Sequence, residues 1–325
     1  MIVFRDPAEV PPGFGPSVVV IGKFDGVHSG HRAVIDRARV EAVSLGAAVV
    51  AVTFDRNPLA LLAPDKCPES LIGVTQKVRL LGDTGVDAVL VLRFDEDFAS
   101  LSADDFARVV LVEALSAQAV LVGADFRFGR GGAGTVESLT AFGRSHGFEV
   151  DVVHDVRAAD RGRRVSSTWI RELLSSGDVA DARKLLGRDH SVVGEVVHGL
   201  KRGREIGYPT ANLSHELEGF VPADGVYAGW LIDEADASGL RPGIRYPAAI
   251  SIGTNPTFDD VASRQVEAYV LDETDLDLYG HHVQLRFVDR IRGMGAFDGI
   301  DALVAQIADD VERTREILGR DQSAD

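Results

Sequence analysis

Continuous apolar runs separated by helical patterns dominate the first half of the chain. These runs are rich in valine and do not alternate with polar residues, which is typical of strands buried on both faces of a sheet. They span residues 17–21, 47–54, 88–92, 119–123 and 149–153. Helical periodicity lies between them, at residues 31–45, 75–84, 102–115 and 136–146. Strands that alternate with helices predict an α/β domain built on a parallel sheet with right-handed crossovers.

The pattern changes near residue 187. A helical stretch at residues 179–186 closes the first half, and extended runs then succeed one another without a long helix between them. These runs span residues 192–197, 226–232, 246–252, 265–270 and 283–288. They predict an antiparallel sheet or small β-barrel, closed by one amphipathic helix over residues 300–318. We therefore expect two domains, residues 1–186 and 187–325, with a disordered tail at 321–325.

Composition and charge restrict the class of protein. The chain has 325 residues, 45% of them apolar, which is enough for two domains with ordinary cores. Its 50 acidic and 34 basic residues give a net charge of −16, which argues against a nucleic acid or an anionic membrane as partner. The single cysteine, Cys67, excludes an intrachain disulfide. Because no signal-peptide pattern and no apolar run of about 18 residues is present, we expect a cytoplasmic enzyme. The oligomeric state is left open.

A glycine-rich segment, GKFDGVHSGH at residues 22–31, joins the first buried run to the first helical pattern. Glycines let the backbone turn tightly and approach a ligand, and the N–H groups of a helix N-terminus suit a phosphate. His28 and His31 are three residues apart, so both can face one ligand and donate to phosphate oxygens. The alternatives are a turn with a surface histidine, or half of a metal site. No third ligand with metal-type spacing lies nearby.

This segment resembles the GxFDGxHxGH signature of the HxGH nucleotidyltransferases, and is most similar to the bacterial bifunctional riboflavin kinase/FAD synthetases. The resemblance can be followed over nearly the whole chain. It implies a Rossmann-like nucleotidyltransferase domain in the first half, followed by an antiparallel β-barrel riboflavin kinase domain with a C-terminal helix. It also implies that His28 and His31 are catalytic and that further residues of the segment bind ATP: Gly22, Phe24, Asp25, Gly26 and Gly30.

Two further strand ends carry parts of the family pattern. Residues 53–58 read TFDRNP where the family usually has TF(D/E)PHP, so Asn57 stands in place of the histidine and cannot carry its charge. Residues 123–129, GADFRFG, are similar to the family's GxDFRFG, which lines the flavin-side pocket. The resemblance makes Asn57, Asp125 and Phe126 candidates for flavin contact. The glycines that follow Phe126 do not form a dinucleotide-binding fingerprint, and a surface loop is the alternative for them.

Residues 164–171, RVSSTWIR, open another helix. Two serines and a threonine at a helix start are typical of capping, and they also suit a phosphate. The segment is similar to the superfamily's ISSTxIR, which meets the phosphates of ATP. The resemblance therefore implies phosphate contacts for Arg164, Ser166, Ser167, Thr168 and Arg171.

The run from His198 to Asn212 combines glycines with basic residues, which in so acidic a chain indicates a phosphate cradle. Thr210 and Asn212 are two residues apart, so on an extended chain both point the same way, and their neutral oxygens suit Mg²⁺. A turn anchored by Pro209 is the alternative. The run is similar to the riboflavin kinase signature that ends in GFPTAN. That resemblance implies a Mg²⁺ site and phosphate contacts from Lys201, Arg202, Gly203, Arg204 and Gly207.

Three later runs extend the resemblance, at residues 224–229, 253–258 and 266–272. The first contains Tyr227, which it makes a candidate for flavin contact. In the last run Glu267 alternates with valine and alanine positions and so faces away from the apolar side of its strand. A solvated strand carboxylate is the alternative. The resemblance places Glu267 beside Thr210 and Asn212 as the catalytic base of the kinase.

Together these residues predict two enzymes on one chain. The second domain would phosphorylate riboflavin to FMN with ATP and Mg²⁺, and the first would adenylylate FMN to FAD with release of pyrophosphate. One alternative is a nucleotidyltransferase for another phosphate acceptor, of the phosphopantetheine or cytidylyl type. A second is a flavin-binding regulatory or storage protein with decayed catalysis, for which the altered TFDRNP run is the support.

Overall fold

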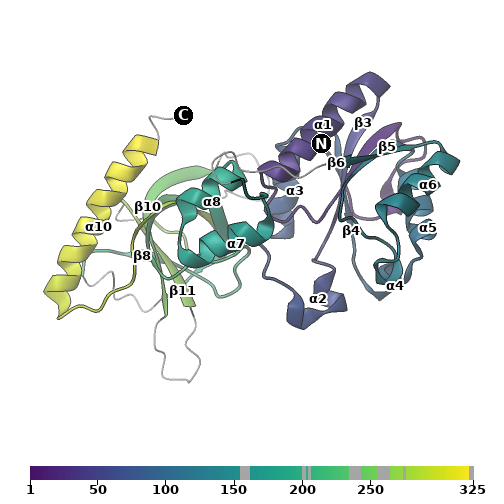
Figure 1. The fold of residues 1–325 in the computed structure, drawn as a ribbon. Helices are drawn as coiled ribbons and strands as arrows, with labels where there is room; N and C mark the ends of the chain where they lie inside the picture. The colour runs from purple at the N-terminus through teal and green to yellow at the C-terminus, as the bar shows by residue number, and fades with distance from the viewer. Residues whose placement is uncertain are drawn as a thin grey trace. The chain divides into compact units, whose positions relative to one another are not determined.

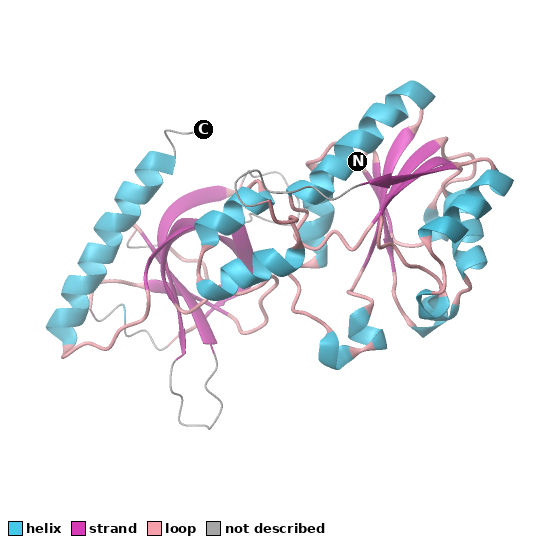
Figure 2. Ribbon diagram, viewed as in Figure 1, coloured by secondary structure: helices cyan, strands magenta, loops and turns pink. Residues whose placement is uncertain are grey.

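The protein is seen here in a computed structural model that describes residues 1–153, 162–199, 203, 206–233, 243–254, 264–273 and 276–321. The chain divides into two compact units, Met1–Ser167 and Thr168–Asp325. Figure 1 traces the units from the purple N-terminus to the yellow C-terminal helix, and Figure 2 shows a sheet in each unit. Residues 322–325, most of the expected disordered tail, lie outside the described residues.

The first unit is built on a parallel sheet, as predicted. Within its described residues six strands pair in the order β1-β4-β3-β2-β5-β6, and every pair is parallel. The strands are β1 (Ile2–Phe4), β2 (Ser17–Ile21), β3 (Ala48–Phe54), β4 (Ala88–Leu92), β5 (Ala117–Gly123) and β6 (Glu149–Val153). Strand β1 was not predicted, because three residues are too few to show a period. The strand order reverses between β2 and β5, and ligands of such sheets bind at this point, beyond the carboxyl ends of the strands.

Helices connect these strands, and most follow the predicted ranges. They are α1 (Ser29–Leu45), α3 (Val74–Gly82), α5 (Ala103–Phe106) with a π-helical continuation (Ala107–Ala114), and α6 (Val136–His146). Two short helices, α2 (Leu59–Leu62) and α4 (Glu96–Ser100), were not predicted. Valines of β2, β3 and β4 are fully buried, which explains their unbroken apolar runs. Phenylalanines from the end of β3, the turn after β4, α4 and α5 pack edge to face.

The second unit contains a closed antiparallel barrel, which confirms the prediction for the second half. Among its described residues the strand order around the barrel is β10-β11-β8-β7-β12-β9, and β9 pairs with β10 to close it. The strands are β7 (His190–Val197), β8 (Thr210–Leu213), β9 (Gly225–Asp233), β10 (Ile244–Thr254), β11 (Arg264–Val270) and β12 (His282–Arg292). Within the described strands, closure pairs each strand with a neighbour on both sides.

Helix α10 (Ile300–Asp321) lies on the outside of the barrel, at the position of the predicted closing helix (Figure 1). Its Leu318 packs against Trp230 and Val288 of the barrel strands. Its Asp310 is buried and accepts hydrogen bonds of 2.9 and 2.8 Å from Nε and Nη2 of Arg292 on β12. The pair fixes the helix to the barrel through matched charges as well as apolar contact.

Helices α7 (Ser167–Ser176) and α8 (Val179–Leu186), which were expected in the first domain, fall almost wholly in the second compact unit. Helix α8 packs against β7 and β12. The end of α7 is tied to the barrel by Arg290, whose Nη1 donates to the Ser176 carbonyl at 3.0 Å, and by Ala223 N, which donates to the Leu174 carbonyl at 2.9 Å. The functional boundary at 186/187 stays a prediction.

Candidate active sites

The histidine pair of the glycine-rich segment is brought together at the carboxyl end of β2. Helix α1 begins at Ser29, two residues earlier than predicted, and His28 is its N-cap. Nδ1 of His28 accepts from the His31 backbone N–H at 3.4 Å, so the neutral ring carries its proton on Nε2. The two rings stack with centroids 3.7 Å apart and planes 15° apart. The spacing of three residues therefore places both imidazoles at one helix N-terminus, where an anion is favoured.

The backbone around these histidines is tightly constrained. A Cβ atom at Gly30 would lie 3.1 Å from the His28 ring, so a larger residue there would push against that ring at the first turn of α1. Gly26 has φ of +87°, but Phe24 and Val27 also have positive φ, +46° and +40°. Such values are strained for residues with a side chain, most of all for β-branched valine. Strain of this kind is held in place by surrounding contacts and is common at functional sites.

Several predicted ATP contacts prove to hold the segment together. Oδ1 of Asp25 accepts from Leu71 N at 2.8 Å, and its carbonyl oxygen accepts from Ser167 Oγ at 2.8 Å. The Phe24 ring is buried, lies under Gly22, and meets His31 edge to face with centroids 5.2 Å apart. The Phe24 and Asp25 side chains thus support the histidines, and phosphate contact through this segment stays a prediction.

At the carboxyl end of β3, the side chain of Asn57 contacts the backbone, and its flavin contact stays a prediction. Oδ1 of Asn57 accepts from Leu59 N at 3.1 Å, so its side chain caps the start of α2. Here sequence reasoning missed Lys77, a lysine of α3 that is only 7% exposed and donates from Nζ to the Phe54 carbonyl at 2.8 Å. A lysine within a short amphipathic helix is usually exposed, so nothing in the sequence indicated that Lys77 is buried.

The end of β5 carries the second predicted flavin segment. Phe126 is partly buried and stacks on Phe128, with ring centroids 5.4 Å apart. Asp125 is exposed, and its carboxylate lies 3.6 Å from Nη1 of Arg164, which brings two predicted site residues together. The following glycines form a closed surface loop, since Gly134 N donates to the Phe128 carbonyl at 2.9 Å. This arrangement fits the loop interpretation given above for these glycines.

The RVSSTWIR segment is divided between the two units. Ser166 and Ser167 belong to the first, where Ser167 contacts Asp25, while Thr168 and Arg171 lie on α7 in the second. Ser166 and Arg171 are half-buried, and Thr168 is exposed. Their phosphate contacts stay predictions.

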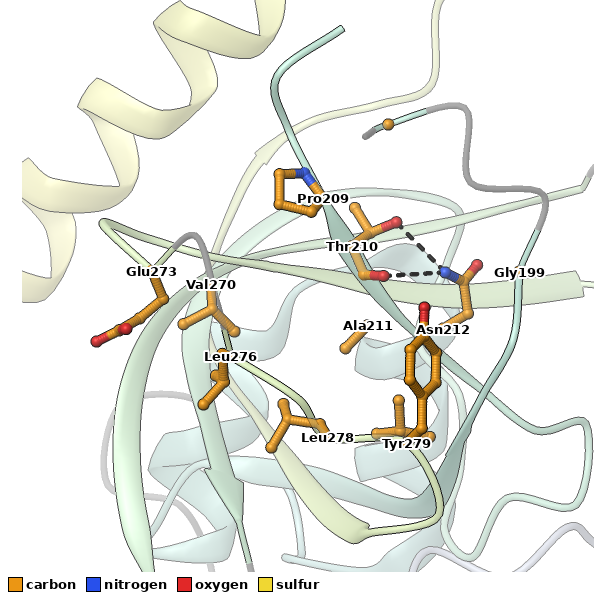
Figure 3. Close-up of a pocket in the computed structure, with 12 residues that line it drawn as sticks. Gly199, Pro209, Thr210, Ala211, Asn212, Val270, Glu273, Leu276, Leu278 and Tyr279 are labelled. Atoms are coloured by element: carbon orange, nitrogen blue, oxygen red, sulfur yellow. Dashed lines mark hydrogen bonds between the residues drawn. The ribbon is translucent and has the colours of Figure 1, made fainter. Parts of the chain in front are cut away.

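In the second unit, Glu267 lies beside Thr210 and Asn212, the predicted metal-binding pair. Glu267 of β11 lies opposite Asn212 of β8, and its Oε2 accepts from the Thr210 hydroxyl at 3.3 Å. The Asn212 side chain is nearly buried, and its Nδ2 donates to the Thr210 carbonyl and hydroxyl at 3.1 and 3.3 Å (Figure 3). Burial raises the pKa of Glu267, and the Thr210 hydrogen bond partly opposes the shift. The three side chains thus form one network, with Glu267 beside Thr210 and Asn212 as the family resemblance implied.

A pocket opens beside this network, at the side of β8 (Figure 3). Gly199 and Gly203 line one part of the pocket. A Cβ atom at Gly199 would lie 2.5 Å from the Asn212 amide. Its apolar lining comes from strands β7 and β11 and from the chain before β12: Val196, Val270, Leu276 and Leu278. Gly207, with φ of +85°, lies in the turn before β8. Lys201, Arg202 and Arg204 lie outside the described residues.

Tyr227 has a structural place in the barrel. Its side chain is fully buried in β9, its hydroxyl donates to the Ala223 carbonyl, and its ring meets Phe287 edge to face. Burial raises the pKa of this hydroxyl. Direct contact between the Tyr227 side chain and flavin is therefore not part of the site that we propose.

Among the described residues, no group of three or more histidine, cysteine, aspartate or glutamate side chains is placed to hold a metal ion. In the same part of the chain, no helix is both long and apolar enough to cross a membrane. A metal held at Thr210 and Asn212 would therefore depend on neutral oxygens together with those of a bound phosphate.

Comparison with known families matches each unit to a different enzyme. Residues 12–169 match the family model for FAD synthetase, and residues 186–318 match that for riboflavin kinase. Each matched range coincides with one of the two folds, the parallel sheet and the barrel.

Whole-chain relatives carry both names. The chain is 39% identical over 302 residues to a bifunctional riboflavin kinase/FMN adenylyltransferase of Escherichia coli, covering 93% of each protein. It is 34% identical to the protein of the same name from Bacillus subtilis, covering 90% of each. A solved structure titled as a macrolide-efflux protein from Streptococcus pneumoniae superposes with a TM-score of 0.82 at 35% identity, covering 97% of this chain and 98% of that one. The chain belongs to the bifunctional riboflavin kinase/FMN adenylyltransferase family.

Proposed function

We propose that this chain performs both reactions of its family, each on its own compact unit. The barrel unit phosphorylates riboflavin with ATP to give FMN. The unit built on the parallel sheet joins FMN to a second ATP and gives FAD and pyrophosphate. The observation that carries this assignment is the order of the two family matches, each of which coincides with one fold.

In the kinase reaction Glu267 is the general base. It accepts the proton of the ribityl 5′-hydroxyl as that oxygen forms a bond to the γ-phosphorus of ATP and the bond to the bridging oxygen breaks. Support comes from its half-buried position, because desolvation raises its pKa and a carboxylate of higher pKa is a stronger base. The hydrogen bond from Thr210 keeps the carboxylate oriented.

The oxygens of Thr210 and Asn212 suit a magnesium ion held together with the phosphates of ATP. Mg²⁺ prefers oxygen ligands, and it often takes few of them from the protein when phosphates supply the rest. Nδ2 of Asn212 now faces Thr210, while Oδ1 accepts from Gln265 at 3.1 Å. To ligate an ion beside the Thr210 hydroxyl, the Asn212 amide must therefore turn over. When bound, the ion neutralises phosphate charge during transfer.

The pocket beside Asn212 is the proposed nucleotide site of the kinase. Its apolar wall offers a surface for a planar base, and Tyr279, whose ring lies 3.9 Å from that of His198, adds an aromatic face. The glycine segment at its edge brings the backbone close to a ligand. Lys201, Arg202 and Arg204 belong to the same segment of sequence and would supply positive charge to the phosphates.

Adenylyl transfer needs no protein nucleophile, because the phosphate of FMN is one already. One of its oxygens forms a bond to the α-phosphorus of ATP, the bond from that phosphorus to the bridging oxygen breaks, and pyrophosphate leaves. The protein aligns the reactants and stabilises charge. His28 and His31 donate to the phosphates from the N-terminus of α1, and Arg164 and Ser166 of the same unit complete the proposed phosphate contacts.

The flavin of this reaction is proposed to lie beyond β5, near Asp125 and Phe126. The stacked rings of Phe126 and Phe128 offer an aromatic surface, and the exposed Asp125 carboxylate offers a hydrogen-bond acceptor. Asn57 is a weaker candidate, because its side chain oxygen is engaged by Leu59 N.

One incubation tests the proposed function. The protein is mixed with riboflavin, ATP and Mg²⁺, and the flavins are separated by chromatography. Formation of FAD is expected. Accumulation of FMN alone would leave only the kinase, and bound but unchanged riboflavin would favour a flavin-binding regulator.

A further inference from the structure

A glutamine of β11 is hydrogen-bonded to the network of the proposed kinase site. Gln265 stands two residues before Glu267, so the two side chains lie on the same face of the strand. Nε2 of Gln265 donates to Oδ1 of Asn212 on β8 at 3.1 Å. This bond joins Gln265 directly to a proposed ligand of the metal ion.

The direction of the hydrogen bonds in this network follows from one backbone carbonyl. The Thr210 carbonyl oxygen can only accept, and Nδ2 of Asn212 donates to it at 3.1 Å and to the Thr210 hydroxyl at 3.3 Å (Figure 3). Oδ1 of Asn212 therefore points the other way, and Gln265 supplies its donor. Thr210 in turn donates to Glu267. The bonds thus run from β11 to β8 and back to β11.

Asn212 depends on a partner on the Gln265 side in either orientation of its amide. It is only 7% exposed, so water cannot readily replace a lost partner. When the Asn212 amide turns over to present Oδ1 beside the Thr210 hydroxyl, Nδ2 faces Gln265 instead. A glutamine suits both states, because its amide carries an acceptor as well as donors. Gln265 can therefore turn together with Asn212 and accept from Nδ2 through Oε1.

We propose that Gln265 is a positioning residue of the kinase, and that it acts through Asn212 to hold the amide in the orientation that presents Oδ1 to a phosphate-bound magnesium ion. The inference rests on the proposed kinase site at Thr210, Asn212 and Glu267. Loss of a partner that orients a metal ligand typically costs about 10- to 100-fold in metal affinity or activity. Loss of the Gln265 amide should therefore weaken Mg²⁺-dependent nucleotide binding and slow FMN formation.

The first test is Gln265→Met in the full-length protein, a change that keeps the length of the side chain and removes its hydrogen bonds. Gln284→Met is the matched control, because Gln284 is a buried glutamine of β12 whose Nε2 donates to Ser191 Oγ at 3.0 Å. Strand β12 pairs with β7 and β9, away from the network. We expect kcat for FMN formation to fall about 10- to 100-fold in Gln265→Met and to stay within about threefold in Gln284→Met. FAD formation from supplied FMN should hold in both.

Nucleotide binding separates positioning from a general loss of structure. The affinity for ADP is measured by calorimetry with and without MgCl₂, on the wild type and on both variants. Gln265→Met should bind ADP alone as the wild type does, and should lose about tenfold or more of the affinity that Mg²⁺ adds. Gln284→Met should keep that gain. An equal loss of ADP affinity with and without MgCl₂ would overturn the proposal, because the pocket itself would then have changed.

Gln265→Glu tests which orientation of the Asn212 amide is used. A carboxylate only accepts, so it suits the turned-over amide, and the gain from Mg²⁺ should be at least that of the wild type. Its added charge would also attract Mg²⁺, so both changes at Gln265 are repeated in an Asn212→Ala background. There Gln265→Met should have no further effect, and the effect of Gln265→Glu should shrink. A further loss from Gln265→Met, or an equal effect of Gln265→Glu in both backgrounds, would overturn the proposal.

Asn212→Ala also distinguishes this inference from the proposed function. Wild-type FMN formation in Asn212→Ala would remove the proposed metal ligand itself. Loss there, together with wild-type FMN formation in Gln265→Met, would remove only the role of Gln265. If Gln265→Met does not fold, Gln265→Leu takes its place. Failure of both to fold would overturn the proposal, because Gln265 would then be required for the barrel as a whole.

Discussion

The Thr210 hydroxyl donates to Oε2 of Glu267 at 3.3 Å, from one strand of the barrel to its neighbour. Thr210 itself pairs in register with Tyr269, so the bond runs diagonally between β8 and β11. It links the proposed base of the kinase to the proposed ligand of its metal ion. The hydrogen bond opposes the effect of burial on the Glu267 pKa, so the basicity of this carboxylate depends on what Thr210 binds.

Replacing Glu267 by glutamine should remove the base and keep the shape of the site. General-base contributions run to about 10²–10⁴-fold, so FMN formation should fall by that order. FAD formation from supplied FMN should hold. Glu195→Gln is the matched control, since Glu195 is an exposed carboxylate on β7 of the same barrel. If the Glu267 variant keeps kinase activity within about threefold, the residue is a strand carboxylate without a catalytic role.

The raised pKa of Glu267 predicts two pH effects. The kinase rate should fall as the pH drops through this raised pKa, because the protonated acid cannot accept the substrate proton. For stability, a carboxyl whose pKa is raised by folding favours the folded state below its ordinary pKa and loses that contribution as the pH rises through the raised value. Glu267→Gln should therefore gain Tm over the wild type at pH 7 but not at pH 4. An equal Tm difference at both values would contradict the raised pKa.

Replacing His31 by alanine should abolish most FMN-to-FAD conversion. Loss of one donor to a charged transition state typically costs about 10²–10³-fold. Riboflavin phosphorylation should continue, and Tm should change little. If both histidines act on one transition state, His28→Ala/His31→Ala should cost less than the product of the single losses. His146→Ala, an exposed histidine of α6, serves as the control. Unfolding of the His31 variant would instead favour a packing role beside Phe24.

A kinase fragment should fold better when it begins at Thr168 than at Gly187. The sequence alone predicts that residues 187–325 make FMN by themselves. The structure adds that α7 and α8 pack with the barrel, and buried side chains of both helices face protein: Trp169, Ile170, Leu173, Leu174, Val179, Ala182, Leu185 and Leu186. Residues 168–325 should therefore show the higher Tm and kinase activity close to that of the whole chain. Equal Tm values for the two fragments would show that the helices add no stability.

Asp310→Ala should loosen α10 from the barrel. Removing one partner of a buried ion pair leaves the other charge unpaired and costs about 3–5 kcal/mol. Arg315→Ala is the comparison, because its pair with Asp272 is largely exposed and should contribute little. Denaturant unfolding measures both. A similar loss of unfolding free energy for the two variants would mean that the Arg292–Asp310 pair contributes no more than an exposed ion pair.

Much of the fold could be read from the sequence because of how its strands are buried. Strands β2 and β4 begin and end at the predicted residues, since burial on both faces gives unbroken apolar runs with clear ends, and the half-buried β6 also matches its predicted range. Strand β1 was not predicted, because it has only three residues and one of them is exposed. The closing pairs of the barrel join strands far apart in the sequence, and local pattern carries no information on such pairing.

The parts of the candidate sites that could be predicted are those formed by residues two or three positions apart in the sequence. Two histidines three residues apart at a predicted helix start could lie together at its N-terminus, and Thr210 and Asn212 had to share a strand face. Other roles depend on contacts between distant segments. The burial of Tyr227 and of Lys77 arises only when distant segments pack together, and a single sequence does not show which segments will.

The absence of a side chain at Gly199 leaves room for the Asn212 amide in the proposed kinase site. The Asn212 amide occupies the space that a Cβ atom would take, at 2.5 Å. A larger residue at position 199 should therefore displace this amide from the Thr210 hydroxyl, and with it one of the two proposed metal ligands.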